Sequence, residues 1–68
     1  MTKAITGTIH NTSFGLFIIP DDQKMVLSVG DTVCLKGQNY AIIGIVPPTR
    51  PDAKWSLKVS VLSELLLF

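Results

Sequence analysis

The residues with the greatest potential for chemistry lie in the first third of the chain. His10 is followed by Ser13, and Asp21 lies further along, so the three residue types of a nucleophilic site are present. Such a site needs a base that activates the serine and a carboxylate that orients the base. No glycine elbow or other positional signature connects these three residues. We therefore predict that the chain is not an enzyme.

Metal and cofactor sites are not predicted either. The chain holds one Cys and one His, which allow neither an internal disulfide nor a zinc site with the usual number of ligands. Asp21 and Asp22 are too few for a calcium loop and are better explained by a turn. Gly30 and Gly37 also fit turns rather than a phosphate-binding loop. Cys34 is interpreted as a small packed side chain, and no cofactor is expected.

Arg50, Lys54, Trp55 and Lys58 form a modest cluster of cations around an aromatic residue. Proteins that bind single-stranded nucleic acid combine such cations with aromatic side chains on which bases stack. Trp55 alternates with Leu57, however, so its ring is expected to face the core rather than solvent. The cluster is therefore interpreted first as a solvated loop, with a nucleic-acid contact as the alternative.

Size and charge limit the classes of protein further. The chain has 68 residues, of which 47% are hydrophobic, and a formal net charge of +1. This composition predicts one small domain, residues 1–68, whose stability is shared with a partner subunit in an oligomer. The low charge disfavours a dedicated duplex-DNA binder. No run is apolar enough for a membrane span or a signal peptide, so we expect a protein that is cytoplasmic at synthesis and contacts no membrane.

Alternating apolar residues and turn residues predict an all-β fold. Five or six short strands are expected, at residues 4–10, 14–19, 25–29, 32–36, 40–46 and 55–61. A hairpin connection is expected at residues 37–39, and a stiff, proline-rich loop at residues 47–54. The spacing of strands and turns predicts a small antiparallel β-barrel, and an SH3-like and an OB-like strand order both stay open.

The apolar tail, residues 62–68, is unusual because chain termini are normally polar. Two interpretations are kept: the tail folds back across the barrel and completes its core, or it docks on another subunit. The tail and the proline-rich loop together form the predicted partner contact. Its members are four bulky apolar side chains and two cations: Leu65, Leu66, Leu67, Phe68, Arg50 and Lys54.

A hairpin pattern extends from residue 27 to residue 59. An apolar residue precedes Gly30-Asp31, an alternating strand and a turn at Gly37 follow, and a strand that begins with Tyr40 ends before a proline and a closing strand. This pattern resembles the barrel core of tailed-phage head–tail joining (connector) proteins. The resemblance implies a virion component that forms a ring of copies and contacts a portal or tail component, with no cofactor and no catalysis.

The first third of the chain supports an alternative function. A glycine-led strand at Gly7 precedes the aromatic-glycine run that starts at Phe14. This order is similar to the opening of cold-shock and S1-type OB barrels, whose aromatic side chains stack nucleic-acid bases. The resemblance implies a single-stranded nucleic-acid-binding module. Its contacts would come from aromatic side chains and a cation: Phe14, Phe17, Trp55 and Lys58.

Overall fold

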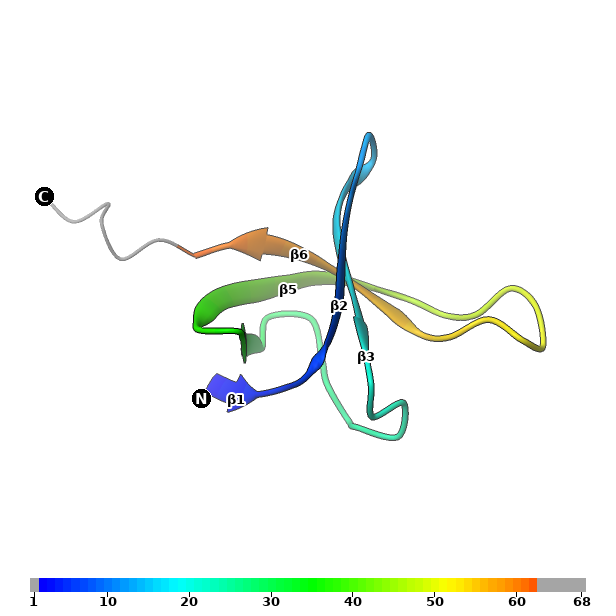
Figure 1. The fold of residues 1–68 in the computed structure, drawn as a ribbon, viewed down its shortest axis with the longest axis horizontal. Helices are drawn as coiled ribbons and strands as arrows, with labels where there is room; N and C mark the ends of the chain where they lie inside the picture. The colour runs from blue at the N-terminus through cyan, green and yellow to red at the C-terminus, as the bar shows by residue number, and fades with distance from the viewer. Residues whose placement is uncertain (1, 63–68) are drawn as a thin grey trace, which may run out of the picture.

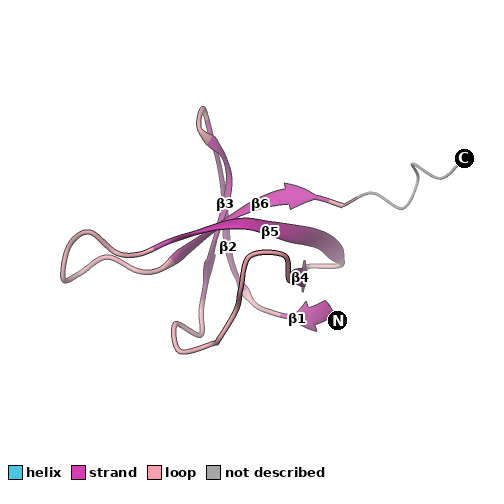
Figure 2. Cartoon of the chain, turned by 180° about the vertical axis from the view of Figure 1, so that it is seen from behind, coloured by secondary structure: helices cyan, strands magenta, loops and turns pink. Residues whose placement is uncertain are grey.

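The computed structural model describes residues 2–62 and builds them from strands and loops (Figures 1 and 2). The strands, in chain order, are β1 (Thr2–Ala4), β2 (Gly7–Thr12), β3 (Gly15–Pro20), β4 (Thr32–Leu35), β5 (Gln38–Val46) and β6 (Ser56–Val61). They form one six-stranded sheet with the order β1-β4-β5-β6-β3-β2. The prediction of an all-β fold is confirmed. Within the described residues the structure contains no helix that is long and apolar enough to span a membrane.

Two antiparallel units cross each other in the sheet (Figure 1). β2 and β3 form a hairpin, whereas β4, β5 and β6 form a meander. The two units are joined by the short β3–β6 ladder, which is centred on Phe17 opposite Lys58. Because the units cross, the tip of the β2–β3 hairpin and the β5–β6 loop project from the sheet in different directions.

The sheet is not closed as a barrel, so this part of the prediction is wrong. Its outer strands, β1 and β2, are consecutive in the chain and are linked by Ile5 and Thr6. The Ile5 N–H donates to Cys34 O (2.9 Å), whereas Thr6 O accepts from the Asp21 N–H (3.0 Å). The chain therefore changes its pairing partner between these two residues, which splits the predicted strand 4–10. β1 also pairs parallel with β4, so the sheet is mixed rather than antiparallel.

The strand predicted at residues 25–29 is wrong as well, because this segment is a loop. Two aspartates accept hydrogen bonds from backbone N–H groups in this segment and just before it. Asp22 Oδ1 accepts from the Lys24 N–H (3.0 Å), and Asp31 Oδ2 accepts from the Ser28 N–H (2.9 Å). Aspartate side chains that bind nearby N–H groups in this way stabilise turns at the expense of strand pairing.

The β4–β5 hairpin turns at Lys36 and Gly37 rather than at the predicted residues 37–39. Leu35 lies opposite Gln38, and both residues between them have positive φ, 53° and 82°. A two-residue turn of this kind matches the twist of the flanking strands. It usually takes Asn or Gly at its first position, so a lysine there carries little turn signal in the sequence.

One face of the sheet, the core face, packs the apolar interior. The buried side chains are Ile5, Ile18, Val33, Leu35, Tyr40, Ile42, Leu57 and Val59. The alternation predicted for β4 is confirmed, since Val33 and Leu35 are buried and Cys34 between them is only half-buried. The opposite face, called the outer face below, carries the residues that alternate with this core.

Candidate functional site

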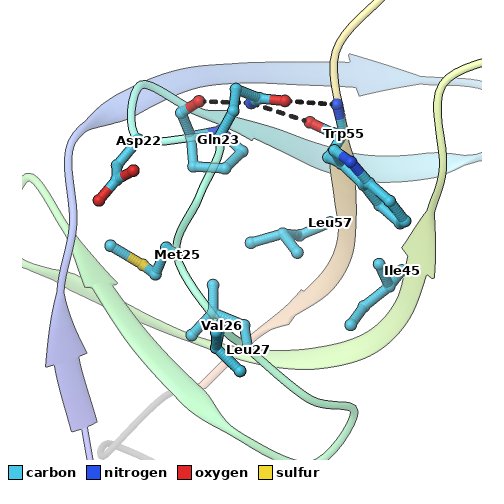
Figure 3. A pocket seen from close by; sticks show the side chains of 9 residues that line it. Asp22, Gln23, Met25, Val26, Leu27, Ile45, Trp55 and Leu57 are labelled. Carbon is cyan, nitrogen blue, oxygen red and sulfur yellow. Dashed lines mark hydrogen bonds between the residues drawn. The ribbon is translucent and has the colours of Figure 1, made fainter.

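A pocket of about 420 Å³ opens between the loop after β3, the end of β5 and the start of β6 (Figure 3). Seven of its nine lining residues are apolar: Pro20, Met25, Val26, Leu27, Ile45, Trp55 and Leu57. The other two are Asp22 and Gln23. Pockets of roughly 300–1,000 Å³ with such a lining bind apolar groups and use a few polar atoms for orientation. This pocket is the candidate functional site.

A β-bulge positions the strand side of the pocket. The register of β5 against β6 shifts between Ile42 and Gly44, so that Ile45, not Gly44, lies opposite the buried Leu57. A bulge inserts one extra residue and moves the following side chains to the other face of the sheet. The bulge therefore turns Ile45 toward the pocket, where it is half-buried. Without it, a glycine would occupy this position on the core face.

The expectation that Trp55 faces the core is only partly correct. Its side chain is 44% exposed, and its ring lies at the edge of the pocket above Ile45 in the view of Figure 3. The last ladder pair of β5 and β6 joins Val46 to Ser56, so Trp55 lies just beyond the sheet. The ring lies on the same face of the sheet as Leu57, as expected for residues two positions apart. It covers a pocket, however, rather than a filled core.

The Gln23 side chain holds this tryptophan in place. Its Oε1 accepts from the Trp55 N–H (2.6 Å), and its Nε2 donates to Trp55 O (3.4 Å) and to Pro20 O (2.7 Å) (Figure 3). The amide thus binds both backbone groups of Trp55, as a neighbouring strand would. The loop after β3 and the start of β6 are therefore fixed to each other.

Three consecutive residues of the loop complete the pocket. Met25 and Leu27 are half-buried and pack against the core, whereas Val26 between them is 81% exposed and lies at the rim. Sequence reasoning assigned these residues to a strand and did not single them out for binding. Their alternation was the available signal, because it shows which side of the segment faces inward.

Polar side chains in the pocket are few, and both take part in hydrogen bonds within the protein. Asp22 is the one charged residue among those that line it, and its Oδ1 accepts from the Lys24 N–H. The Gln23 amide is occupied by the hydrogen bonds described above. Across residues 2–62, no group of three or more His, Cys, Asp and Glu side chains could hold a metal ion. The arrangement is thus suited to binding apolar side chains.

The residues considered for nucleophilic chemistry are not brought together. Ser13 lies in the turn before β3, and Asp21 follows the opposite end of the same strand. At about 3.4 Å per residue, the six residues of β3 separate them by roughly 20 Å. His10 lies opposite Phe17 on the outer face and is exposed. These three residues therefore form no common site.

The outer face brings together some of the predicted nucleic-acid contacts. Phe17 lies between His10 on β2 and Lys58 on β6, in one row across three strands. Phe14 is 81% exposed at the tip of the β2–β3 hairpin, away from this row. Trp55 belongs to the pocket on the core face. The structure thus joins Phe17 with Lys58 and separates both from the other two aromatic residues.

The predicted partner contact is described only in part. Arg50 and Lys54 are both exposed in the β5–β6 loop. This loop has an internal hydrogen bond from the Ala53 N–H to Arg50 O (3.0 Å). The tail residues predicted to contact a partner, 65–68, lie outside the described residues.

Comparisons of the chain with protein-family models, curated proteins and solved structures found no match. The proposals below therefore rest on the pocket, the outer face and the sequence. The pocket has the more complete geometry of the two surfaces, since its volume, lining and hydrogen bonds are all defined.

Proposed function

We propose that the chain is a non-enzymatic assembly protein that works through protein–protein contacts. The observation that carries this proposal is the apolar pocket with its exposed rim. Val26 is 81% exposed and Trp55 44% exposed, and both belong to a lining that is mainly apolar. Exposed apolar surface beside a pocket is typical of interaction sites. Tryptophan and methionine are also enriched where proteins bind each other.

In its specific form, the proposal is a virion component of the phage head–tail connector type, in which copies form a ring. The hairpin pattern of residues 27–59 supports it, and so do the two loops that project from the sheet. Projecting loops can reach a neighbouring copy or a portal or tail component. The net charge of +1 permits identical copies to approach without strong repulsion.

The same proposal relates the sheet to small SH3-like or OB-like barrels. Residues 2–12 support this relation, because β1 pairs with β4 and β2 pairs with β3. This short segment of the chain thereby supplies both edge strands of the sheet. In this view, the fold is an opened form of such a barrel.

Sedimentation velocity of the pure protein over a wide concentration range tests the assembly function. We expect species whose masses are multiples of 7.4 kDa and whose populations grow with concentration. A chain that stays monomeric at every concentration, including at high protein concentration, would contradict self-assembly.

A single-stranded nucleic-acid-binding module is the second candidate function. The row of His10, Phe17 and Lys58 favours it, because an aromatic side chain beside a cation is a suitable stacking site for a base. Adding labelled oligo-dT to the same sedimentation experiment tests this candidate. Oligonucleotide that sediments with the protein at low salt and is released at higher salt would favour this function over assembly.

A further inference from the structure

We propose that the pocket of one copy receives the apolar tail of a second copy of this chain. The inference rests on the proposed assembly function and names the two surfaces that make the contact. The donor is the run Leu65–Phe68, whose four residues are all bulky and apolar. The receptor is the pocket bordered by Val26 and Trp55.

The chemistry of the two surfaces is complementary. The pocket is lined mainly by aliphatic, thioether and aromatic groups, and its volume of about 420 Å³ is not filled by the described side chains. Its best-placed polar group, the Gln23 amide, is bonded to Trp55 and Pro20 and offers little to a polar ligand. Leucine and phenylalanine side chains need no such partners, and burying them together with the pocket lining removes apolar surface of both from water.

A copy's own tail cannot readily fill its own pocket. Leu62 is held at the far end of β6, since its N–H donates to Asn39 O (3.0 Å) and its carbonyl accepts from Gln38 Nε2 (2.8 Å). Leu57, the pocket residue on β6, lies five residues earlier, or about 16 Å away along the strand. Phe68, the far end of the run, is six residues beyond Leu62 and reaches at most about 20 Å from it when every residue is fully extended, a margin of only about 4 Å over the distance to Leu57.

The direction of the chain removes this margin. Figure 1 shows β6 ending on the side opposite the β5–β6 loop, next to which the pocket opens. A tail that returned to its own pocket would first have to reverse direction and would lose several residues to the turn. The pocket of a neighbouring copy carries no such restriction, so a second copy is the occupant that the geometry favours.

This contact has a definite symmetry. The tail of one copy and the pocket of the next are different surfaces, so the interface is heterologous. Heterologous contacts repeat from copy to copy and form a ring when the rotation closes. The ring in the proposed function and the tail-to-pocket contact thus follow from one arrangement.

Two full-length variants and one control test the contact. Val26→Asp places a charge at the pocket rim, at a side chain so exposed that the fold has little need of it. Leu66→Asp places the same charge in the tail. Val29→Asp is the matched control, because Val29 is 62% exposed in the same loop but does not line the pocket.

We expect V26D and L66D to be monomeric under conditions in which the unmodified chain and V29D associate. Mixing V26D with L66D should restore a one-to-one complex, since one partner keeps an intact tail and the other an intact pocket. Trp55 is the single tryptophan, so its fluorescence reports the pocket directly. Its emission should shift to shorter wavelength when the complex forms.

The outcomes separate the two proposals. If V26D associates as the unmodified chain does, the pocket is not the receptor; the inference is overturned while the assembly function stands. The same conclusion holds if V26D and L66D remain monomeric when mixed. If the unmodified chain itself never associates, the assembly function fails and the inference fails with it.

Discussion

The pocket on the core face and the row of His10, Phe17 and Lys58 on the outer face are built from the same strands in different ways. The outer row follows directly from regular pairing of β2, β3 and β6. The pocket depends on irregular features, namely a bulge in β5, a loop without strand pairing and a side-chain amide that binds Trp55. Regular strand pairing therefore produces the row of side chains on the outer face, whereas the departures from regular pairing produce the pocket.

This difference also separates the energetic roles of the two faces. The core face buries eight apolar side chains and continues into the mainly apolar pocket. The outer face mixes an aromatic ring, a cation and an imidazole that are all in contact with water to some degree. We therefore expect substitutions on the core face to affect stability most, and substitutions on the outer face to affect it least.

The largest effect is expected for Ile18→Ala. Ile18 is fully buried between both units of the sheet, so the substitution should lower the free energy of unfolding by about 2–5 kcal/mol. Ile43→Ala is the matched control, because Ile43 is 52% exposed at the bulge. Its cost should stay below about 1 kcal/mol. Urea denaturation of both variants checks the contrast, and equal losses would mean that the two faces do not differ in packing.

A smaller effect is expected when a methyl group is added at a glycine of each face. In Gly7→Ala, the new Cβ would overlap the Ile19 carbonyl oxygen and lie 2.9 Å from Pro20 Cα, so β2 and β3 would have to move apart. Overpacking of this kind costs about 1–3 kcal/mol. In Gly44→Ala, the nearest atom is Lys58 Cβ at 3.5 Å, an ordinary contact. Thermal unfolding should show a lower Tm for G7A and little change for G44A.

The regular part of the fold could be predicted from the sequence. Runs of apolar residues identified β4, β5 and β6, and alternation placed Val33 and Leu35 on the core side of β4. It failed at residues 25–29, where the same alternation belongs to a loop. Any extended segment that lies on a core alternates buried and exposed side chains, whether or not it forms hydrogen bonds with a neighbouring strand. Hydrogen bonds that Asp22 and Asp31 accept from N–H groups two and three residues away decide the outcome, and alternation of apolar residues carries no information about them.

The candidate site was predictable only through single residues. The sequence pattern placed Trp55 on the same face as Leu57. The pocket also needs Ile45, however, which faces it because of the bulge in β5. The bulge has no clear sequence signal beyond a glycine at Gly44. Gln23 lies in a turn, 32 positions before its partner Trp55, so local patterns do not indicate this contact. The closed barrel was predicted because strand spacing alone does not show which strands pair at the ends of a sheet.

Gln23→Ala should have a moderate effect that is centred on the pocket. It removes the hydrogen bonds to both backbone groups of Trp55 and should destabilise the fold by about 1 kcal/mol. Gln23→Glu is the informative comparison, because it keeps an acceptor for the Trp55 N–H but loses the donor to Pro20 O. Trp55 fluorescence should shift more in Q23A than in Q23E. Unchanged emission in both variants would show that the amide does not position the ring.

The smallest effect is expected for Lys58 on the outer face, where packing and charge can be separated. Its aliphatic chain lies close to two glycines: a Cβ on Gly15 would be 3.2 Å from Lys58 Cε, and one on Gly44 would be 3.5 Å from Lys58 Cβ. Lysine stems often cover apolar surface in this way while the ammonium group stays in water. Lys58→Met keeps the stem and should change stability by less than about 0.5 kcal/mol.

Lys58→Ala removes both the stem and the charge and should lower stability by about 0.8 kcal/mol, because about one buried CH₂ group is lost. If the outer row binds single-stranded nucleic acid, K58M and K58A should weaken oligo-dT binding equally, since each lacks the cation that faces phosphate. Stability and binding would then rank the two variants differently. Equal stability of K58M and K58A would mean that the stem contributes no packing, and Phe17 would then be the remaining apolar member of the outer row.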